Sequence, residues 1–149
     1  MRAVLQRVNE ASVIVDHKEV GKINKGLLIL MGVTEEDDQN DIEWLTKKII
    51  NMRIFGDAEG KMNLSLKDID GEVLIVSQFT LYASTKKGNR PSYLRSAKPI
   101  TAIPLYESFV DEFRKHDINP EEGIFGADMK VHLINDGPVT ISLDTKEKE

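Results

Sequence analysis

The sequence of 149 residues predicts a single α+β domain with a largely antiparallel or mixed sheet. Runs of β-branched and apolar residues recur along the whole chain, whereas only two segments repeat apolar residues at helical spacing. These strands and helices do not alternate regularly, as they would in a parallel sheet built from βαβ units. The predicted domain covers residues 1–143, and the charged segment 144–149 is expected to be a flexible tail.

The first third of the chain is expected to form strands. Residues 2–15 contain two β-rich runs and predict one long or bent strand. Residues 16–19 predict a turn into a strand over residues 20–23. Gly26 then breaks the chain before residues 27–33, whose continuous apolar run is typical of a strand buried on both faces.

The next segment predicts a helix of about three turns. Acidic residues over positions 34–38 favour a helix start, because they complement the positive end of the helix dipole. Ile42, Leu45 and Ile49 follow at positions i, i+3 and i+7 and would form its buried face. A short strand is expected around residues 52–55.

A second helix is predicted in the last half of the chain. Its apolar residues recur at i, i+3, i+4 and i+7, and they are Tyr106, Phe109, Val110 and Phe113. Pro104 is compatible with the first turn of this helix, where its missing N–H costs nothing. The helix is expected to end near His116 or Asp117.

The C-terminal part predicts two more strands. Residues 128–135 alternate polar and apolar side chains, as a half-buried strand does. Residues 135–138 read Asn-Asp-Gly-Pro, the sharpest turn signal in the chain, and residues 139–143 resume a strand.

One stretch combines a buried strand with polar residues at its end. Residues 73–76 are apolar, which predicts a strand buried on both faces, and Ser77, Gln78 and Thr80 follow directly. Polar residues in this position can form a functional site. They can equally be local hydrogen-bonding partners at a strand end, and this stretch alone does not separate the two interpretations.

Several classes of protein and site find no support in the sequence. Without cysteine the chain has no disulfide, thiolate nucleophile or cysteine metal site, and its histidines show no paired ligand spacing. It contains neither of the common phosphate-binding glycine loops and no Gly-x-Ser-x-Gly motif. No run is long and apolar enough to span a membrane, and the start is charged too early for a signal peptide. We therefore expect a cytoplasmic protein without a metal or cofactor.

The charge of the chain is distributed unevenly. Residues 84–98 carry five cations and no acid, although the whole chain has a net charge of −5, so the rest carries −10. The five cations are Lys86, Lys87, Arg90, Arg95 and Lys98. Such a local basic patch suits a focused contact with a polyanion, and it is equally compatible with a solvated loop.

Three segments together resemble the signature segments of the D-aminoacyl-tRNA deacylase family, in its bacterial and eukaryotic type. They are Ser77-Gln78-Phe79-Thr80-Leu81, Gly88-Asn89-Arg90-Pro91-Ser92 and Asn135-Asp136-Gly137-Pro138-Val139-Thr140. The likeness extends to residues 6–8 and 53–64 and covers essentially the whole chain except the charged tail. Separate motifs in the expected order are far more specific than any one alone.

This resemblance implies a fold, an assembly and a reaction. Family members are homodimers with a β-barrel-like fold flanked by helices. They hydrolyse the ester that joins a D-amino acid to the terminal adenosine of tRNA, and they reject the L form. Because glycine is achiral, glycyl-tRNA is an expected second substrate. The implied partners are aminoacyl-tRNA and a second subunit, with no DNA, no membrane and no cofactor.

The resemblance assigns the chemistry to Ser77, Gln78, Phe79 and Thr80, which would line the aminoacyl pocket. Backbone N–H groups of Phe79 or Thr80 could donate to the oxygen that gains charge during ester hydrolysis. Thr80 could attack as a nucleophile, but no histidine in the sequence is an evident base for it. The family is described as relying on the 2′-hydroxyl of the terminal ribose, so we interpret these residues first as pocket formers.

Other residues receive implied roles in selection and binding. Gly137 and Pro138 resemble the Gly-cisPro element that each subunit inserts into its partner's pocket, where carbonyl oxygens exclude an L side chain. Arg7 resembles the residue that supports this element. Phe125 and Met129 match positions associated with the terminal adenine, for which stacking and apolar contact give a physical reason.

Lys86, Lys87 and Arg90 are the candidates for contacts with the tRNA backbone. Two other functions stay open. A hydrolase of another small D-aminoacyl ester or amide would need the pocket without this loop. A non-catalytic tRNA-binding module would need the loop without the pocket.

Overall fold

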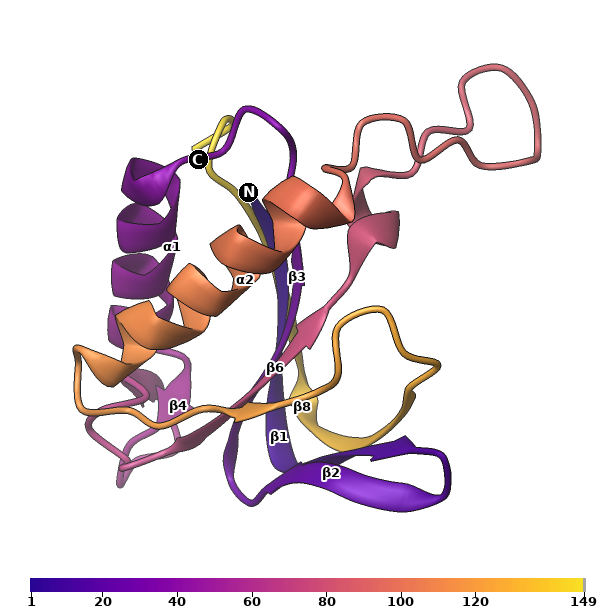
Figure 1. The fold of residues 1–149 in the computed structure, drawn as a ribbon. Helices are drawn as coiled ribbons and strands as arrows, with labels where there is room; N and C mark the ends of the chain where they lie inside the picture. Colours follow the sequence, from indigo (N-terminus) through magenta and orange to yellow (C-terminus); the bar gives the residue numbers. More distant parts are fainter. Residues whose placement is uncertain (149) are drawn as a thin grey trace.

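The computed structural model describes residues 1–148 and shows a strongly curved sheet with two helices on one face (Figure 1). The strands are β1 (Arg2–Val15), β2 (Lys18–Ile23), β3 (Gly26–Gly32), β4 (Phe55–Gly56), β5 (Met62–Leu64), β6 (Glu72–Ser77), β7 (Glu121–Glu122) and β8 (Lys130–Asp144). The helices are α1 (Gln39–Asn51), the short 3-10 helix η1 (Phe79–Tyr82) and α2 (Pro99–Arg114). The α+β class predicted from the sequence is confirmed.

The long strand β1 organises the sheet. The strand order is β2-β1-β3-β6-β7, with β8 also paired to β1. The first half of β1 pairs with β3 and its second half pairs with β2. Strand β8 pairs with β1 along almost the whole length of β1, from Arg2 opposite Asp144 to Ile14 opposite Lys130. These pairings are antiparallel, but β3 and β6 run parallel, as do β6 and β7. The mixed sheet and the long first strand are therefore as predicted.

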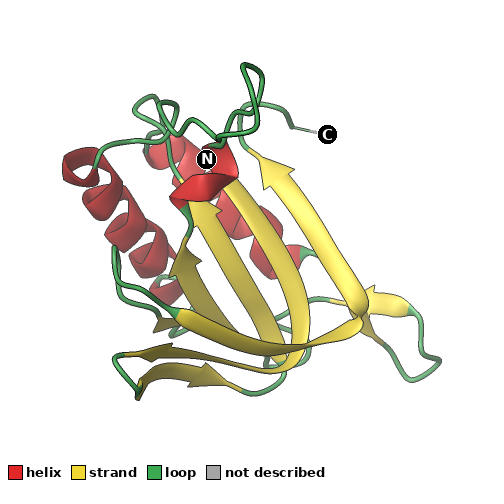
Figure 2. Ribbon diagram, turned by 90° about the vertical axis from the view of Figure 1, so that its right-hand side faces the viewer, coloured by secondary structure: helices red, strands yellow, loops and turns green. Residues whose placement is uncertain are grey.

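The sheet curls until it is nearly closed like a barrel (Figure 2). Its two end strands, β2 and β7, approach each other at Gly21. A Cβ atom at Gly21 would lie 2.6 Å from the carbonyl oxygen of Glu122 and 3.2 Å from Leu74 Cδ1. Only a residue without a side chain permits this approach.

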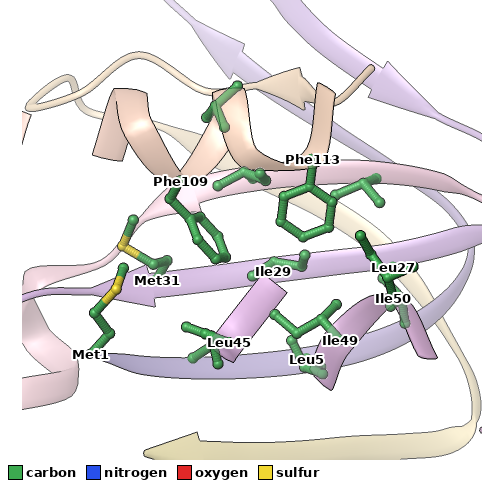
Figure 3. Close-up of a cluster of buried hydrophobic side chains, with 14 of the residues drawn as sticks. Met1, Leu5, Leu27, Ile29, Met31, Leu45, Ile49, Ile50, Phe109 and Phe113 are labelled. Carbon is green, nitrogen blue, oxygen red and sulfur yellow. The ribbon is translucent and has the colours of Figure 1, made fainter. Parts of the chain in front are cut away.

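Successive side chains of β3 and β6 belong to two different hydrophobic clusters. The cluster between the sheet and the helices includes Leu27, Ile29, Met31, Val73 and Ile75, which pack with α1 and α2 (Figure 3). The cluster inside the curled sheet includes Leu28, Leu74 and Val76. Because side chains alternate across a strand and both faces are covered, both strands are continuously apolar in the sequence.

Helix α1 is the predicted first helix. Asp38 caps it by accepting hydrogen bonds from the backbone N–H groups of Asn40 and Asp41, and the Asp41 carboxylate accepts one from Asp38 N–H. This reciprocal capping box satisfies donors that the first turn leaves without partners. The three residues predicted to form the buried face, Ile42, Leu45 and Ile49, are buried.

The predicted start of the second helix was wrong. Helix α2 begins at Pro99, with Lys98 as its N-cap residue, and Pro104 lies inside the helix. The missing N–H of Pro104 leaves the carbonyl of Ile100 without its helical partner, and Ile100 is exposed to solvent. An internal proline is therefore tolerated so close to the helix start. The helix also ends earlier than predicted, at Arg114, and Asp117 adopts a positive φ of 63° just beyond it.

The strand predicted around residues 52–55 is shorter and begins later. Met52 is the C-cap residue of α1, and its N–H donates to the carbonyl of Ile49, so it does not enter a sheet. Only residues 55 and 56 form β4, which pairs with β5 in a separate two-stranded ribbon. The Asp57 carboxylate shapes the connecting turn by accepting hydrogen bonds from the N–H groups of Glu59 and Lys61.

The predicted turn at residues 135–138 does not separate two strands. Strand β8 is continuous on both sides of it, with Asn135 opposite Val8 and Thr140 opposite Gln6 on β1. Residues 136–139 therefore leave the ladder as a bulge, called here the Gly137–Pro138 loop, and the chain resumes in the same direction. The Asn135 side-chain oxygen accepts a hydrogen bond from Val139 N–H (2.9 Å) across its base, and the peptide bond before Pro138 is cis.

The two ends of the described chain lie together (Figure 1). The ammonium group of Met1 donates to Asp37 Oδ1 and to Thr145 Oγ1, both at 2.6 Å, and Lys146 pairs with Asp41 at 2.8 Å. The first residues of the segment expected to be a tail thus make buried or ionic contacts. In the described part of the chain, no helix has the length and apolar character needed to cross a membrane.

Candidate active site

A cleft of about 270 Å³ opens where β6 ends. The chain leaves the sheet after Ser77, with Gln78 N–H donating to the carbonyl of Met31 on β3 (2.7 Å), and turns into η1. The ends of β3 and β6 form one wall, the start of α2 a second, and the segment before β8 a third. The lining includes Ser77, Gln78, Phe79, Tyr106, Phe125 and Met129.

This lining brings together residues that are far apart in the sequence. Ser77, Gln78 and Phe79, predicted as catalytic, line the same cleft as Phe125 and Met129, predicted for adenosine. The two groups meet because β7 pairs with β6 and brings the segment that follows it back over the end of β6.

Thr80 is held beside the cleft without lining it. Its hydroxyl oxygen accepts a hydrogen bond from the Gln78 side-chain amide. Phe79 and Thr80 are the first two residues of η1, so their backbone N–H groups have no acceptor within that helical turn. These N–H groups are suited to hydrogen-bond an oxygen that gains negative charge.

Sequence reasoning missed Gly32 as a cleft residue. It ends β3, and a Cβ atom there would lie 2.8 Å from the carbonyl oxygen of Gln78, so a side chain would displace the start of η1. The signal was present, since an isolated glycine in a strand often marks close approach of another backbone.

Tyr106 was predicted only as a core residue, and it also forms the floor of the cleft. Its hydroxyl donates to the carbonyl of Ile75 (3.0 Å), and its ring meets Phe125 edge-on, with centroids 6.0 Å apart. Burial, and to a lesser degree the nearby Glu122, raises the pKa of Tyr106. The phenol therefore stays protonated and supports the cleft without acting as a base.

The cleft offers little acid–base chemistry. Asp128 is the one carboxylate among its lining residues, and it pairs with Lys130 at 2.9 Å on the exposed side. The three histidines lie elsewhere: His17 in the turn after β1, His116 after α2 and His132 on β8. Among residues 1–148 no group of three potential metal ligands is found. The cleft lining therefore holds no histidine, and its one carboxylate is paired with a lysine.

The Gly137–Pro138 loop does not line the cleft of its own chain. It lies opposite Arg7, between Gln6 and Val8 on β1, whereas the cleft lies near Ala3, roughly 13 Å away at 3.3 Å per strand residue. The loop borders a separate hollow with Phe55 and Gly56. Gly137 and Pro138 are both exposed.

Arg7 holds the base of this loop. Its Nε donates to the carbonyl of Asp136 (2.9 Å), and its Nη1 donates to the carbonyl of Ile54 (2.6 Å). The Asp136 carboxylate also lies 3.4 Å from Arg7 Nε. Gly137 has a φ of 138°, a conformation that residues with a side chain rarely adopt. The loop is thus presented outward in a fixed shape.

The basic loop projects from the molecule just after η1 (Figure 1). Two hydrogen bonds between Ser84 and Ser92, 2.8 and 2.9 Å long, close its base. Lys86, Lys87 and Arg90 are exposed at its tip, and none of them makes an ion pair with residues 1–148. These cations are free to meet an external anion.

Comparisons with known proteins agree with this arrangement. The family model described as D-Tyr-tRNA(Tyr) deacylase matches residues 4–144. A protein named D-aminoacyl-tRNA deacylase from Flavobacterium psychrophilum is 61% identical over 150 residues, covering 100% of both chains. Another of that name, from Fusobacterium nucleatum, is 57% identical and covers 99% of this chain and 97% of its own.

Two solved structures share the fold. A protein named c-Myc DNA Unwinding Element Binding Protein superposes with a TM-score of 0.90 at 41% identity, covering 97% of this chain and 98% of its own. A probable eukaryotic D-amino acid tRNA deacylase superposes with a TM-score of 0.79 at 17% identity, covering 95% and 97%.

Proposed function

Because the chain belongs to the D-Tyr-tRNA(Tyr) deacylase family, we propose that it hydrolyses the ester between a D-amino acid and the 3′-terminal adenosine of tRNA. It releases glycine from tRNA as well and leaves L-aminoacyl-tRNA intact. The observation that carries this proposal is the cleft itself, which combines the end of β6 with Phe125 and Met129 in one small space. That space suits an aminoacyl group and a nucleobase side by side.

Hydrolysis at this cleft relies on hydrogen-bond donors. Water attacks the ester carbonyl carbon, the carbonyl oxygen gains negative charge, and the N–H groups of Phe79 and Thr80 donate to it. The bond from the carbonyl carbon to the 3′-oxygen then breaks, and that oxygen takes a proton. The 2′-hydroxyl beside it assists, because no histidine lines the cleft and its one carboxylate, Asp128, is paired with Lys130.

Selection against L-amino acids requires a second subunit. The Gly137–Pro138 loop is exposed, is fixed by Arg7 and does not reach the cleft of its own chain. In a homodimer the loop of one subunit enters the cleft of the other, where its carbonyl oxygens occupy the space that an L side chain would need. Glycine has no side chain to exclude, so it passes the same test.

The remaining candidates bind the nucleic acid. Phe125 and Met129 hold the terminal adenine by stacking and apolar contact, and Lys86, Lys87 and Arg90 contact backbone phosphates. The substrate is made in the cytoplasm, where we place the enzyme.

The function is tested with three substrates: D-tyrosyl-tRNA, L-tyrosyl-tRNA and D-tyrosine methyl ester. We expect rapid release of tyrosine from the first alone. Equal rates on the D and L forms would contradict chiral selection. Hydrolysis of the methyl ester at the same rate would indicate a general D-ester hydrolase, and tRNA binding without turnover would indicate a binding module.

The route is tested with Thr80→Ala and with a substrate whose terminal ribose lacks the 2′-hydroxyl. We expect Thr80→Ala to keep appreciable activity, because the backbone N–H survives the substitution. The 2′-deoxy substrate should bind but react poorly. Thr85→Ala, on the basic loop, is the matched control. Full turnover of the 2′-deoxy substrate would overturn the substrate-assisted route, and a trapped ester on Thr80 would establish the covalent one.

Assembly is tested by sedimentation at the concentrations used in the assay. We expect a dimer. A fully active and fully selective monomer would show that the loop acts in some other way.

A further inference from the structure

Phe79 and Tyr93 form an aromatic surface that continues outward from the cleft. Their ring centroids lie 5.0 Å apart with an interplanar angle of 73°. Phe79 is 56% exposed and lines the cleft, whereas Tyr93 is 39% exposed and lies outside the lining. Aromatic rings of this size are usually buried in the core, so an exposed pair at the mouth of a site suggests a binding role.

The segment that carries Tyr93 is anchored to the cleft wall. Ser96 Oγ donates to the carbonyl of Phe79 (2.7 Å), and Ser96 N–H donates to the carbonyl of Tyr93 (3.0 Å). Ala97 N–H donates to the carbonyl of Val33 (2.9 Å). The pair is therefore held in place before any ligand arrives, which lowers the ordering cost of binding.

Two cations, Arg95 and Lys98, lie in the same segment as Tyr93. The guanidinium of Arg95 lies 5.8 Å from the centre of the Tyr82 ring, which keeps it beside η1. Neither Arg95 nor Lys98 forms an ion pair with residues 1–148, and residues 84–98 contain no acid. Exposed aromatic faces beside free cations are the combination by which proteins bind single-stranded nucleic acid.

We propose that Phe79 and Tyr93 form a stacking platform for the unpaired nucleotides that precede the terminal adenosine of the substrate. This inference rests on the proposed function and extends it beyond the aminoacyl-adenosine moiety. Phe79 belongs to both the cleft and the platform, so a strand with its last nucleotide in the cleft meets Tyr93 directly outside. Arg95 and Lys98, in the same segment as Tyr93, supply positive charge for the phosphates of that strand. The positive charge of this segment favours a polynucleotide as the ligand over an apolar surface of another protein.

The test compares two non-hydrolysable ligands that carry D-tyrosine in amide linkage. One is 3′-(D-tyrosylamino)adenosine, and the other has the same group at the end of the trinucleotide cytidine-cytidine-adenosine. We expect the wild-type protein to bind the trinucleotide about tenfold more tightly, at the lower end of what base stacking contributes. Tyr93→Leu should remove this difference and leave the affinity for the mononucleoside unchanged.

Two further variants make the result specific. Tyr93→Phe keeps the aromatic face and should bind both ligands as the wild type does. Leu94→Ala removes a neighbouring apolar side chain that is 95% exposed but has no ring, and it should change neither affinity. Phe79 is left intact, because it belongs to the cleft.

Four outcomes would overturn the platform. They are equal binding of the two ligands by the wild type, an equal loss for both ligands in Tyr93→Leu, no loss for either, and a Tyr93→Leu protein that sediments differently from the wild type. The last result would make Tyr93 part of a subunit contact. The proposed function fails separately, if D-tyrosyl-tRNA is not hydrolysed. If a trinucleotide without the aminoacyl group still bound in a way that depended on Tyr93, the platform would be supported even though the proposed function had failed.

Discussion

The cleft and the Gly137–Pro138 loop lie on the same sheet and are built in opposite ways. The cleft forms where two parallel strands, β3 and β6, end side by side, and its walls come from four separate parts of one chain. The loop is a bulge within a single strand, held by Arg7 and Asn135 and exposed at its tip. One is a concave site lined by a single chain, and the other is a rigid projection with nothing in its own chain to act on.

Under the proposed function, this difference separates catalysis from selection. A site that holds an ester and stabilises a developing charge needs several converging donors, which only the ends of packed elements provide. A device that excludes one enantiomer needs a hard surface at a fixed place, which a well-braced loop provides. Damage to the cleft should therefore reduce the rate on every substrate, whereas damage to the loop should reduce the preference for D over L.

The largest effect is expected from Gly32→Ala in the cleft. A Cβ atom would lie 2.8 Å from the carbonyl oxygen of Gln78 and would shift the start of η1. A displacement of this kind costs roughly 100-fold in rate, so kcat/KM should fall by about that factor on D-tyrosyl-tRNA and on glycyl-tRNA alike. Gly56→Ala is the control, because a Cβ atom there meets nothing within 4 Å. Unchanged rates in Gly32→Ala would show that η1 need not be placed precisely by β3.

Arg7→Ala should weaken the loop and spare the cleft. It removes the hydrogen bonds to the carbonyls of Asp136 and Ile54, each made by a charged donor. Such bonds are worth about 1.5 to 3 kcal/mol, so the ratio of kcat/KM for D- over L-tyrosyl-tRNA should fall roughly 30-fold. Arg53→Ala is matched to it, since Arg53 also donates to a backbone carbonyl, that of Asn63, but makes no hydrogen bond to the loop. A fall in the D rate with an unchanged ratio would assign Arg7 to the cleft instead.

Replacing Lys86, Lys87 and Arg90 by Ala should change neither the rate constant for hydrolysis of bound substrate nor the preference for D- over L-tyrosyl-tRNA. Binding of tRNA should weaken by about tenfold at moderate salt, and the slope of log affinity against log salt concentration should fall by roughly 2 to 3, because fewer counterions are released. A triple variant at Lys18, Lys22 and Lys47, exposed cations on β2 and α1, is the control. Identical salt slopes in both variants would place the tRNA on another surface.

The smallest effect is expected from a contact remote from both regions. Partial burial raises the pKa of Asp41, but hydrogen bonds with Lys146, Thr145 and the backbone of Asp38 outweigh it and hold the pKa at about 2. The stability that this carboxylate contributes is thus present above its unfolded pKa near 3.8 and is lost as the pH falls toward 2.

Urea unfolding between pH 5 and pH 2 should show this loss, of about 1 kcal/mol after allowance for solvent screening. The Asp41→Asn protein should lack that part of the pH dependence and should keep wild-type rate and selectivity. A changed D over L ratio in Asp41→Asn would mean that the cleft and the loop are coupled through α1.

The elements with a strong local pattern could be predicted from the sequence. The long strand β1, the buried strands β3 and β6 and the capped helix α1 follow from apolar runs and capping residues that act over a few positions. The polar residues that follow β6 were also recognised as a candidate site. The role of Gly137 and Pro138, with Arg7 as their support, was implied by the family resemblance. The start of α2 was predicted wrongly from Pro104. Two prolines, Pro99 and Pro104, lie near the start of this helix, and the preference of proline for the first turn does not choose between them.

The sequence by itself determined the strands β1, β3 and β6, the helix α1 and the motifs that mark the family, because hydrophobic period, capping and turn chemistry are local. Only the tertiary structure decided that residues 136–139 bulge from one strand, since the Asn-Asp-Gly-Pro sequence would also close a hairpin and the choice depends on pairing with β1. The tertiary structure alone also united Phe125 and Met129 with Ser77, through the pairing of β6 with β7. Contacts between distant segments depend on how the whole sheet curls, and no local pattern encodes that curvature.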